Sequence, residues 1–333
     1  MSFALRKWKA ARPSFMLVFA LFALALAACA DDADATPPTP APTEATVATP
    51  TSTPEPTPTE VPPLVVADSD GFEVEFAQPP SRIISFSPGA TEILFTIGAG
   101  DQVIAADQFS DFPAETADLE RVDYSAPDPE RSLSLDPDLV ILATRQQESV
   151  EQFRGLGLVV LFNLEPESVE GVLENIALLG EITGHQEEAA ALVADMQSRI
   201  EAVETALADI ESGPRVYYEL SDGLYTAAPD TFIGGYLSLL KASNVAAGAE
   251  SPFPQLTVEA LIEANPEVIL LADAAFLEGG PESVAARSGW DAIDAVINER
   301  VYPVDPDIGN RPGPRIVDAI EQVASLLYPE LFE

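Results

Sequence analysis

Short apolar runs recur from about Leu64 to the C-terminus, and helix-forming stretches separate them. The runs cover residues 82–86, 103–106, 138–142, 158–162, 215–218 and 267–271. Strands that are apolar along nearly their whole length are typical of parallel sheets with both faces covered. The alternation therefore predicts an α/β fold with parallel, helix-covered sheets.

A long segment with helical character lies between the fourth and fifth apolar runs. It predicts one helix that ends near Thr183 and Gly184, and a second from Gln186 to Glu211 that contains neither Pro nor Gly. A helix of about 25 residues is roughly 37 Å long, more than one small lobe needs. We interpret it as a brace, which places an N-terminal lobe at 64–185, the interlobe helix at 186–212 and a C-terminal lobe at 213–333.

An internal repeat supports two similar lobes. Glu130 is followed seven residues later by Pro137 and an apolar run, and Glu259 is followed seven residues later by Pro266 and another, so the two copies keep one constant offset. Each copy predicts a short helix opened by a Glu, a Pro break and a buried strand. Repeated units of this kind indicate structurally related halves.

The N-terminus has the features of a secretory signal peptide. Four basic residues precede an apolar run from Phe15 to Ala28, which is shorter than the roughly 20 residues that a membrane span needs. The run ends in Leu26-Ala27-Ala28-Cys29, which resembles the bacterial lipobox, and Cys29 is the only Cys of the chain. We therefore expect residues 1–29 to be a lipoprotein leader and Cys29 to carry the acyl chains that anchor the protein.

Residues 30–63 predict a disordered tether. The segment from Asp31 to Pro63 is dominated by Pro and Thr and contains almost no large apolar side chains. Such a composition favours an extended chain with a reach of up to roughly 100 Å. A folded domain on this tether is expected to lie outside the cytoplasm, anchored to the cell membrane.

Charge and composition exclude several classes of function. The 16 basic and 55 acidic residues give a net charge of −39, which cannot form the basic face that nucleic acid requires. One Cys and one His cannot form a disulfide framework, a zinc cluster or a Cys-His catalytic pair. No nucleophile elbow, phosphate-binding loop or His-Glu-x-x-His segment occurs, so we expect neither an enzyme, nor a cofactor, nor a metal site.

Several segments resemble one transport family. They are Arg82-Ile83-Ile84-Ser85-Phe86-Ser87-Pro88-Gly89-Ala90-Thr91-Glu92-Ile93-Leu94, Phe109-Ser110-Asp111-Phe112-Pro113, Val122-Asp123-Tyr124 and Arg311-Pro312-Gly313-Pro314-Arg315-Ile316. They are similar to class III substrate-binding proteins of ABC importers, the cobalamin and iron-siderophore type, and the first two favour the cobalamin branch. The resemblance implies two Rossmann-like lobes joined by one rigid helix, with a ligand cleft between them.

The candidate ligand-binding residues follow from chemistry and from this resemblance. Ligands of open α/β sheets lie beyond the carboxyl ends of the strands. Aromatic and charged residues in the loops expected there are Phe109, Phe112, Tyr124, Arg145, Tyr225, Phe253, Asp307 and Arg311. The resemblance implies that Phe109, Tyr124 and Phe253 form aromatic walls and that Asp307 and Arg311 make polar contacts.

Charge favours a corrinoid, such as cobalamin, over a polyanionic ferric chelate. A polyanion needs several convergent Arg residues, and only Arg145, Arg311 and Arg315 are candidates. A neutral or cationic siderophore, or another metal chelate, is the alternative ligand. A surface lipoprotein with an adhesive or scaffolding role and no small ligand is the alternative class.

The expected partner is an importer permease of two transmembrane subunits with its ATPase. The resemblance implies that Glu130 and Glu259, which occupy matching positions in the two lobes, each meet an Arg of one permease subunit. Both also open short helices, where a carboxylate is favoured by the helix dipole, so helix capping is the structural alternative.

Overall fold

All six predicted apolar strands are present and lie in parallel sheets, so the predicted α/β fold is confirmed. The computed structural model describes residues 62–278 and 280–332. The predicted leader, Cys29 and nearly all of the predicted tether lie outside these residues. The described residues belong to a single unit of the chain, which contains both lobes.

The N-terminal lobe is built on a five-stranded parallel sheet in the order β5-β4-β3-β6-β7. Its strands are β3 (Ile83–Ser85), β4 (Val103–Asp107), β5 (Glu120–Val122), β6 (Leu139–Leu142) and β7 (Val160–Phe162). Alternate side chains of β3 and β6 enter two separate apolar clusters, one with α1 (Pro88–Thr96) and α4 (Val169–Thr183), the other with α3 (Val150–Gly155). Both faces of the sheet are therefore covered, which explains its continuous apolar runs.

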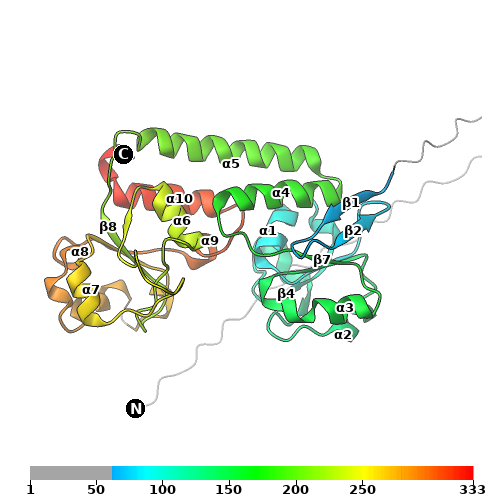
Figure 1. Ribbon diagram of the computed structural model, residues 1–333, viewed down its shortest axis with the longest axis horizontal. Coiled ribbons are helices and arrows are strands. Elements are labelled where there is room, and N and C mark those ends of the chain that lie inside the picture. Colours follow the sequence, from blue (N-terminus) through cyan, green and yellow to red (C-terminus); the bar gives the residue numbers. More distant parts are fainter. Residues whose placement is uncertain (1–61, 279, 333) are drawn as a thin grey trace, which may run out of the picture. The chain divides into compact units, whose positions relative to one another are not determined.

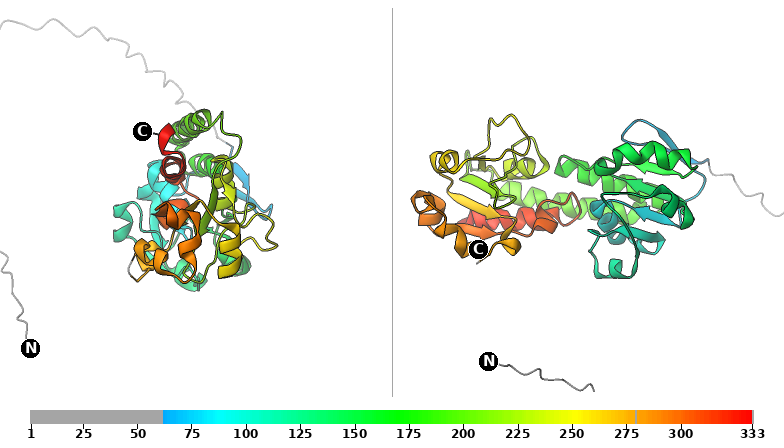
Figure 2. Two further views of the ribbon diagram at one scale, coloured as in Figure 1. Left: turned by 90° about the vertical axis from the view of Figure 1, so that its left-hand side faces the viewer. Right: turned by 90° about the horizontal axis from the view of Figure 1, so that it is seen from below.

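The C-terminal lobe repeats this plan with four parallel strands in the order β11-β10-β8-β9. The strands are β8 (Arg215–Glu219), β9 (Ser243–Asn244), β10 (Val268–Leu271) and β11 (Val301–Pro303). One face packs against α6 (Phe232–Leu239) and α10 (Ile316–Leu327), the other against α7 (Val258–Ala264) and α8 (Asp294–Ile297). The right-hand view of Figure 2 shows the two lobes side by side.

The internal repeat of the sequence corresponds to matching elements. The helix α2 (Pro129–Ser134) precedes β6 in the first lobe, and α7 precedes β10 in the second. Each of these strands is fully buried and pairs with the first sheet strand of its own lobe, β3 or β8. The repeat therefore marks an interior strand of each sheet.

The interlobe helix α5 (Gln186–Ala206) extends above both lobes and packs against α4 and α10 (Figure 1). Arg199 of α5 binds two carboxylates of α10, with 2.6 Å from Nη2 to Asp318 and 2.9 Å from Nε to Glu321. The helix ends five residues before the predicted Glu211, so its predicted length is wrong. Leu207 is fully buried and caps the helix, and tight turns of the i to i+3 type follow it.

Short elements complete the fold. The sequence did not predict the antiparallel hairpin of β1 (Leu64–Ala67) and β2 (Glu73–Phe76), nor the short strands β5, β9 and β11. Asp68 follows β1, and its buried carboxylate pairs with Arg154, whose guanidinium lies 4.0 Å from the centre of the Phe72 ring. The hairpin is thereby fixed to the first lobe.

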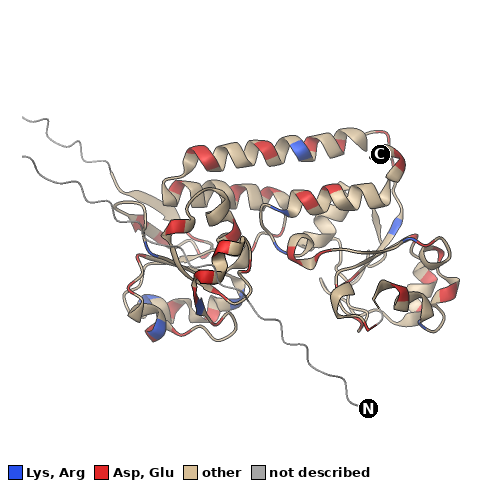
Figure 3. Ribbon diagram, turned by 180° about the vertical axis from the view of Figure 1, so that it is seen from behind, with Lys and Arg blue, Asp and Glu red and all other residues tan. Residues whose placement is uncertain are grey.

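Acidic residues are spread over both lobes, and basic residues are sparse (Figure 3). Among the described residues, no helix is both long and apolar enough to cross a membrane.

Candidate functional site

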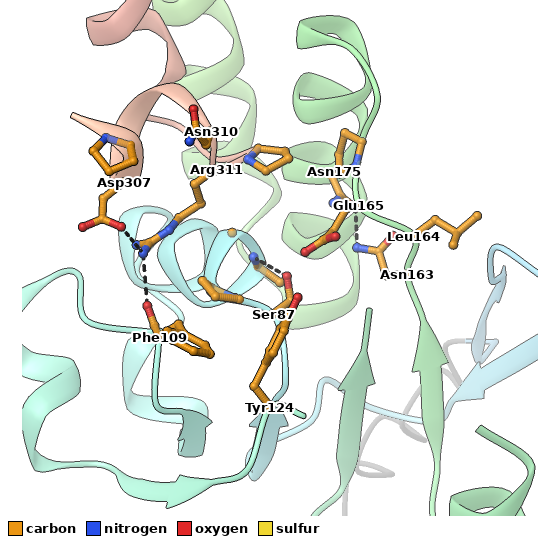
Figure 4. Close-up of a pocket in the computed structure, with 16 residues that line it drawn as sticks. Ser87, Phe109, Tyr124, Asn163, Leu164, Glu165, Asn175, Asp307, Asn310 and Arg311 are labelled. Carbon is orange, nitrogen blue, oxygen red and sulfur yellow. Dashed lines mark hydrogen bonds and ion pairs between the residues drawn. The ribbon is translucent and has the colours of Figure 1, made fainter. Parts of the chain in front are cut away.

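A pocket of about 330 Å³ lies at the carboxyl edge of the N-terminal sheet and is closed on one side by the C-terminal lobe (Figure 4). Its walls come from the loops after β3, β4, β5 and β7, and from the segment after β11 that includes α9 (Pro306–Gly309). The lining residues are Ser87, Pro88, Gly89, Ala90, Phe109, Tyr124, Asn163, Leu164, Glu165, Pro166, Asn175, Pro306, Asp307, Asn310, Arg311 and Pro312. This is the edge where open α/β sheets bind ligands.

Two aromatic rings form the apolar wall. Phe109 and Tyr124 pack edge to face, with ring centroids 5.4 Å apart and planes at 88°. The Phe109 ring remains half exposed, and Tyr124 is partly buried. Their free faces are available to a flat apolar ligand.

The loop that carries Phe109 is fixed by buried polar groups. Asp107, fully buried at the end of β4, accepts hydrogen bonds from the Phe109 N–H (2.8 Å) and the Ser110 hydroxyl (2.7 Å). Arg121 of β5 donates to the carbonyls of Asp107 and Ser110, both at 2.9 Å. The position of the Phe109 ring is therefore set by the sheet itself.

The backbone of Tyr124 is held at both ends. Its N–H donates to the Gln108 side chain at 3.0 Å, and its carbonyl accepts from Gln146 at 2.7 Å. Burial, with the charges of Glu165 and Asp107, raises the pKa of the Tyr124 hydroxyl to about 12. The hydroxyl is therefore neutral at any physiological pH.

Opposite the aromatic wall lies a set of hydrogen-bonding groups that the sequence did not predict. Asn163 donates to the Asn175 side chain at 2.6 Å, and Glu165 lies beside them (Figure 4). Burial, then the charge of Asp107, raises the pKa of Glu165, and burial also raises the pKa of Asp107. For Asn163 and Glu165 the signal available in the sequence was their place directly after the apolar run 158–162, whereas Asn175 lies on α4.

Arg311 is the one cation among the described residues that line the pocket, and carboxylates of both lobes surround it. Its guanidinium donates to Asp307 at 3.0 Å and to Asp111 at 3.1 Å, and to the Phe109 carbonyl at 3.1 Å. The Arg311 side chain is 11% exposed, so most of its hydrogen-bonding capacity is used within the protein. Asn310, beside it, is held by the Tyr218 hydroxyl at 2.6 Å.

Four of the eight predicted ligand-binding residues line the pocket, namely Phe109, Tyr124, Asp307 and Arg311. Phe112 lies instead under the Arg315 guanidinium, 3.9 Å from the ring centre. Arg145 is exposed after β6, near enough to Tyr124 for its charge to oppose the rise in that residue's pKa.

Tyr225 and Phe253 do not line the pocket. They follow β8 and β9 and are 44% and 52% exposed, so they lie at the carboxyl edge of the other sheet. Phe276, which the sequence did not single out, follows β10 and is 85% exposed.

Glu130 and Glu259 are both exposed in the first turns of α2 and α7. Within the described residues, no three His, Cys, Asp or Glu side chains are grouped to hold a metal ion.

Two α/β lobes with a pocket at the carboxyl edge of a parallel sheet define a two-lobed solute-binding protein. The chain belongs to the periplasmic binding protein family, whose model matches residues 83–308. This confirms the family resemblance read from the sequence.

Individual relatives match over most of the chain. An ABC transporter substrate-binding lipoprotein of Bacillus subtilis, YvrC, is 31% identical over 282 residues, which are 82% of this chain and 88% of that protein. A protein of Halobacterium salinarum named cobalamin-binding protein is 30% identical and covers 80% of this chain and 74% of its own. The crystal structure of the vitamin B12-binding protein BtuF of Vibrio cholerae superimposes with a TM-score of 0.66 at 28% identity, over 77% of this chain and 99% of that one.

Proposed function

We propose that this protein is the extracytoplasmic substrate-binding component of an ABC importer and that it captures a corrinoid such as cobalamin. One observation carries the proposal. The pocket combines an aromatic wall of Phe109 and Tyr124 with a single lining cation, Arg311, that is already bound to carboxylates. This combination suits a broad ligand without net negative charge.

Aromatic contact supplies the affinity. A ring that loses about 150 Å² of exposed surface to a flat macrocycle gains roughly 4 kcal/mol before the entropy of association is subtracted. Phe109 offers a half-exposed ring, held by the edge-to-face contact with Tyr124. Little ordering is therefore needed when the ligand binds.

The polar groups of the pocket select against anions. Glu165 and Asp307 present carboxylates, and Asn163, whose amide nitrogen donates to Asn175, presents an amide oxygen that can accept hydrogen bonds. The peripheral primary amides of a corrinoid are hydrogen-bond donors that such acceptors recognise. A polyanionic ferric chelate would meet these carboxylates without a free guanidinium on the pocket wall.

The size of the ligand determines which residues it reaches. A cavity of about 330 Å³ is at the small end of the range for small-molecule sites. A corrinoid therefore projects beyond it, toward the exposed rings after the C-terminal strands, Tyr225, Phe253 and Phe276. These rings supply the second wall in this proposal.

The relatives support transport as the context. One is named a substrate-binding lipoprotein of an ABC transporter and others are named for cobalamin or vitamin B12. We infer that Cys29 carries the lipid anchor, that the tether 30–63 spaces the lobes from the membrane, and that Glu130 and Glu259 meet the permease, whose ATPase drives import. The role is binding, and no catalytic step is assigned.

The test is a titration of the full-length protein with cyanocobalamin, followed by calorimetry and by the absorbance of the corrin ring. We expect saturable binding of one corrinoid per chain at micromolar protein. Neutral, cationic and anionic ferric siderophores form the comparison panel. Binding of a siderophore alone would replace the corrinoid assignment, and no binding by any of them would favour the adhesive or scaffolding role.

A further inference from the structure

Glu92 is a buried carboxylate at the boundary between the lobes. It lies on α1, only 1% exposed, and both of its oxygens face the C-terminal lobe. Oε1 accepts a hydrogen bond from the backbone N–H of Arg315 at 3.1 Å, and Oε2 accepts one from Arg315 Nη2 at 2.8 Å. Arg311 Nη1 lies 3.9 Å from the same Oε2. One carboxylate of the first lobe thus holds two arginines of the second.

The backbones of the two lobes are in direct contact around this carboxylate. A Cβ atom on Gly89 of α1 would come within 2.5 Å of the Pro312 carbonyl oxygen, and one on Gly313 would lie 3.4 Å from the Glu92 carboxyl group. Glycine is required for this close approach at position 89, whereas a Cβ at position 313 would only be in van der Waals contact with Glu92. The segment 311–315, between α9 and α10, is therefore fitted against the start of α1.

A second element of the first lobe holds the same segment. The Arg315 guanidinium lies over the Phe112 ring, 3.9 Å from its centre, which is the geometry of a cation–π contact. Burial alone would lower the pKa of Arg315, but the hydrogen bond and the charge of Glu92 raise it above the ordinary value. The arginine therefore stays charged.

The pocket wall depends on this arrangement. Arg311 both lines the pocket and is one of the two arginines that pair with Glu92, and its neighbours Asn310 and Pro312 also line the pocket. A displacement of segment 311–315 away from α1 would carry Arg311 and Pro312 with it, together with the adjoining Asn310, and widen the pocket.

We infer that Glu92 is a positioning residue that sets the width of the ligand pocket by holding segment 311–315 of the C-terminal lobe against α1. The inference concerns the spacing of the lobes. It rests on the proposed function only where ligand affinity is used as a readout.

Glu92→Gln keeps the shape of the side chain and removes its charge. Cys29 is the only native Cys, so the full-length chain with Cys29→Ser contains no thiol and can be labelled at introduced cysteines alone. This protein is kept in detergent. Spin labels on Leu133→Cys of α2 and Glu263→Cys of α7, both exposed, then report the distance between the lobes by pulsed electron resonance. Without ligand, we expect a broader distance distribution in Glu92→Gln than in the parent. In a separate titration, we expect Glu92→Gln to bind cyanocobalamin about tenfold more weakly, a loss of 1.4 kcal/mol.

Asp68→Asn and Glu219→Gln are matched controls. Both carboxylates have fully buried side chains and pair with an arginine, Arg154 or Arg287, but each pair lies within one lobe. They should lower stability and leave the distance distribution unchanged. If either control broadens the distribution as much as Glu92→Gln does, the effect is general loss of stability and the inference fails.

Arg315→Gln tests the contact from the other lobe, and also serves if Glu92→Gln does not fold. It should also broaden the distance distribution. The double variant Glu92→Gln with Arg315→Gln should be little broader than either single variant, because both changes remove the same interaction. A narrow, parent-like distribution in both single variants overturns the inference, as does a broad distribution with unchanged cyanocobalamin affinity. If the parent binds no cyanocobalamin, the proposed ligand is wrong, and the distance measurement still decides the role of Glu92.

Discussion

The ring of Phe109 meets the ring of Tyr124 edge to face, with centroids 5.4 Å apart and planes at 88°. The two residues follow adjacent strands, β4 and β5, so the register of the sheet brings them together. Such a pair contributes about 0.5 to 1.5 kcal/mol beyond the area it buries. Each ring therefore holds the other in place at the pocket wall before any ligand arrives.

Tyr124→Ala should weaken cyanocobalamin binding by about 1 to 3 kcal/mol, because it removes one ring and frees the other. Tyr124→Phe keeps the ring and should retain most of the affinity. Isothermal titration measures both, with Ile297→Ala on α8 as a control at an exposed apolar residue of the other lobe. Equal affinity of Tyr124→Ala and the parent would remove Tyr124 from the site.

Phe253→Ala tests the second wall. Phe253 follows β9, is 52% exposed and does not line the pocket, so it contributes only if the ligand projects beyond the cavity. We expect a loss of about 1 to 3 kcal/mol in affinity with little change in the free energy of unfolding. Titration beside urea unfolding separates the two effects, and an unaffected Kd would confine the ligand to the N-terminal wall.

The sequence predicted the framework of the fold well because its central strands are buried on both faces. Runs such as 138–142 and 267–271 are apolar throughout, and that pattern has few structural alternatives. The strands β5, β9 and β11 are only two or three residues long, and most of their residues are exposed or only partly buried. They therefore leave no periodic apolar signal in the sequence. The end of α5 was missed because Leu207 and Ile210 continue the helical pattern while turning toward the core.

The site was predictable only in part, since sequence position does not give side-chain partners. Phe109 was found from its place after the apolar run 103–106, and Tyr124 from the family resemblance. Glu92 stands out in the sequence only as part of a motif, because the arginines that it binds lie near the other end of the chain. A similar separation in sequence hid the fact that Arg311 is bound by Asp111.

Glu130 and Glu259 should act in docking. The capping positions of their helices are already filled, since Asp128 accepts from the Arg131 N–H at 2.9 Å and Thr257 accepts from the Ala260 N–H at 3.1 Å. Replacing both glutamates with Ala should therefore cost little stability and leave ligand affinity unchanged. It should lower permease-stimulated ATP hydrolysis and the salt dependence of docking, because exposed charges act mainly on encounter and orientation.

The matched control for this pair is the double replacement of Glu151 and Glu263 by Ala. Both are exposed helix residues, one on each lobe, outside the repeat positions. If the Glu130 and Glu259 double variant stimulates hydrolysis as well as this control does, the two residues only stabilise their helices through the dipole.

Cys29→Ser should release the protein from the membrane or leave it unprocessed. The mature chain would be held by acyl chains on Cys29, and the apolar run before it is too short to span a bilayer. Membrane fractionation and intact mass measure anchoring and processing. A variant that is cleaved and fractionates with lipid as the parent does would show that Cys29 is not the anchor.

The last prediction concerns Asp273, which lies two residues after β10 and is 6% exposed. Neither carboxylate oxygen has a hydrogen-bond partner among the described residues. Burial, and then the charge of Glu219, raises its pKa to about 6. Glu219 is itself fully buried, and Arg287 holds its side chain in position through hydrogen bonds of 2.6 and 2.7 Å.

A raised pKa means that the folded protein binds this proton more tightly than the unfolded chain does. The stability contributed by protonated Asp273 is fully present below the ordinary value of 3.8 and is lost as the pH rises through about 6. Asp273→Asn should therefore raise the free energy of unfolding by about 1 to 2 kcal/mol at pH 8, part of the effect being screened by water, and the gain should shrink toward pH 4. Urea unfolding across this range measures it, with exposed Asp230→Asn of the same lobe as the control. A gain that is the same at pH 4 and pH 8 would mean that the amide improves packing and that the buried charge costs nothing.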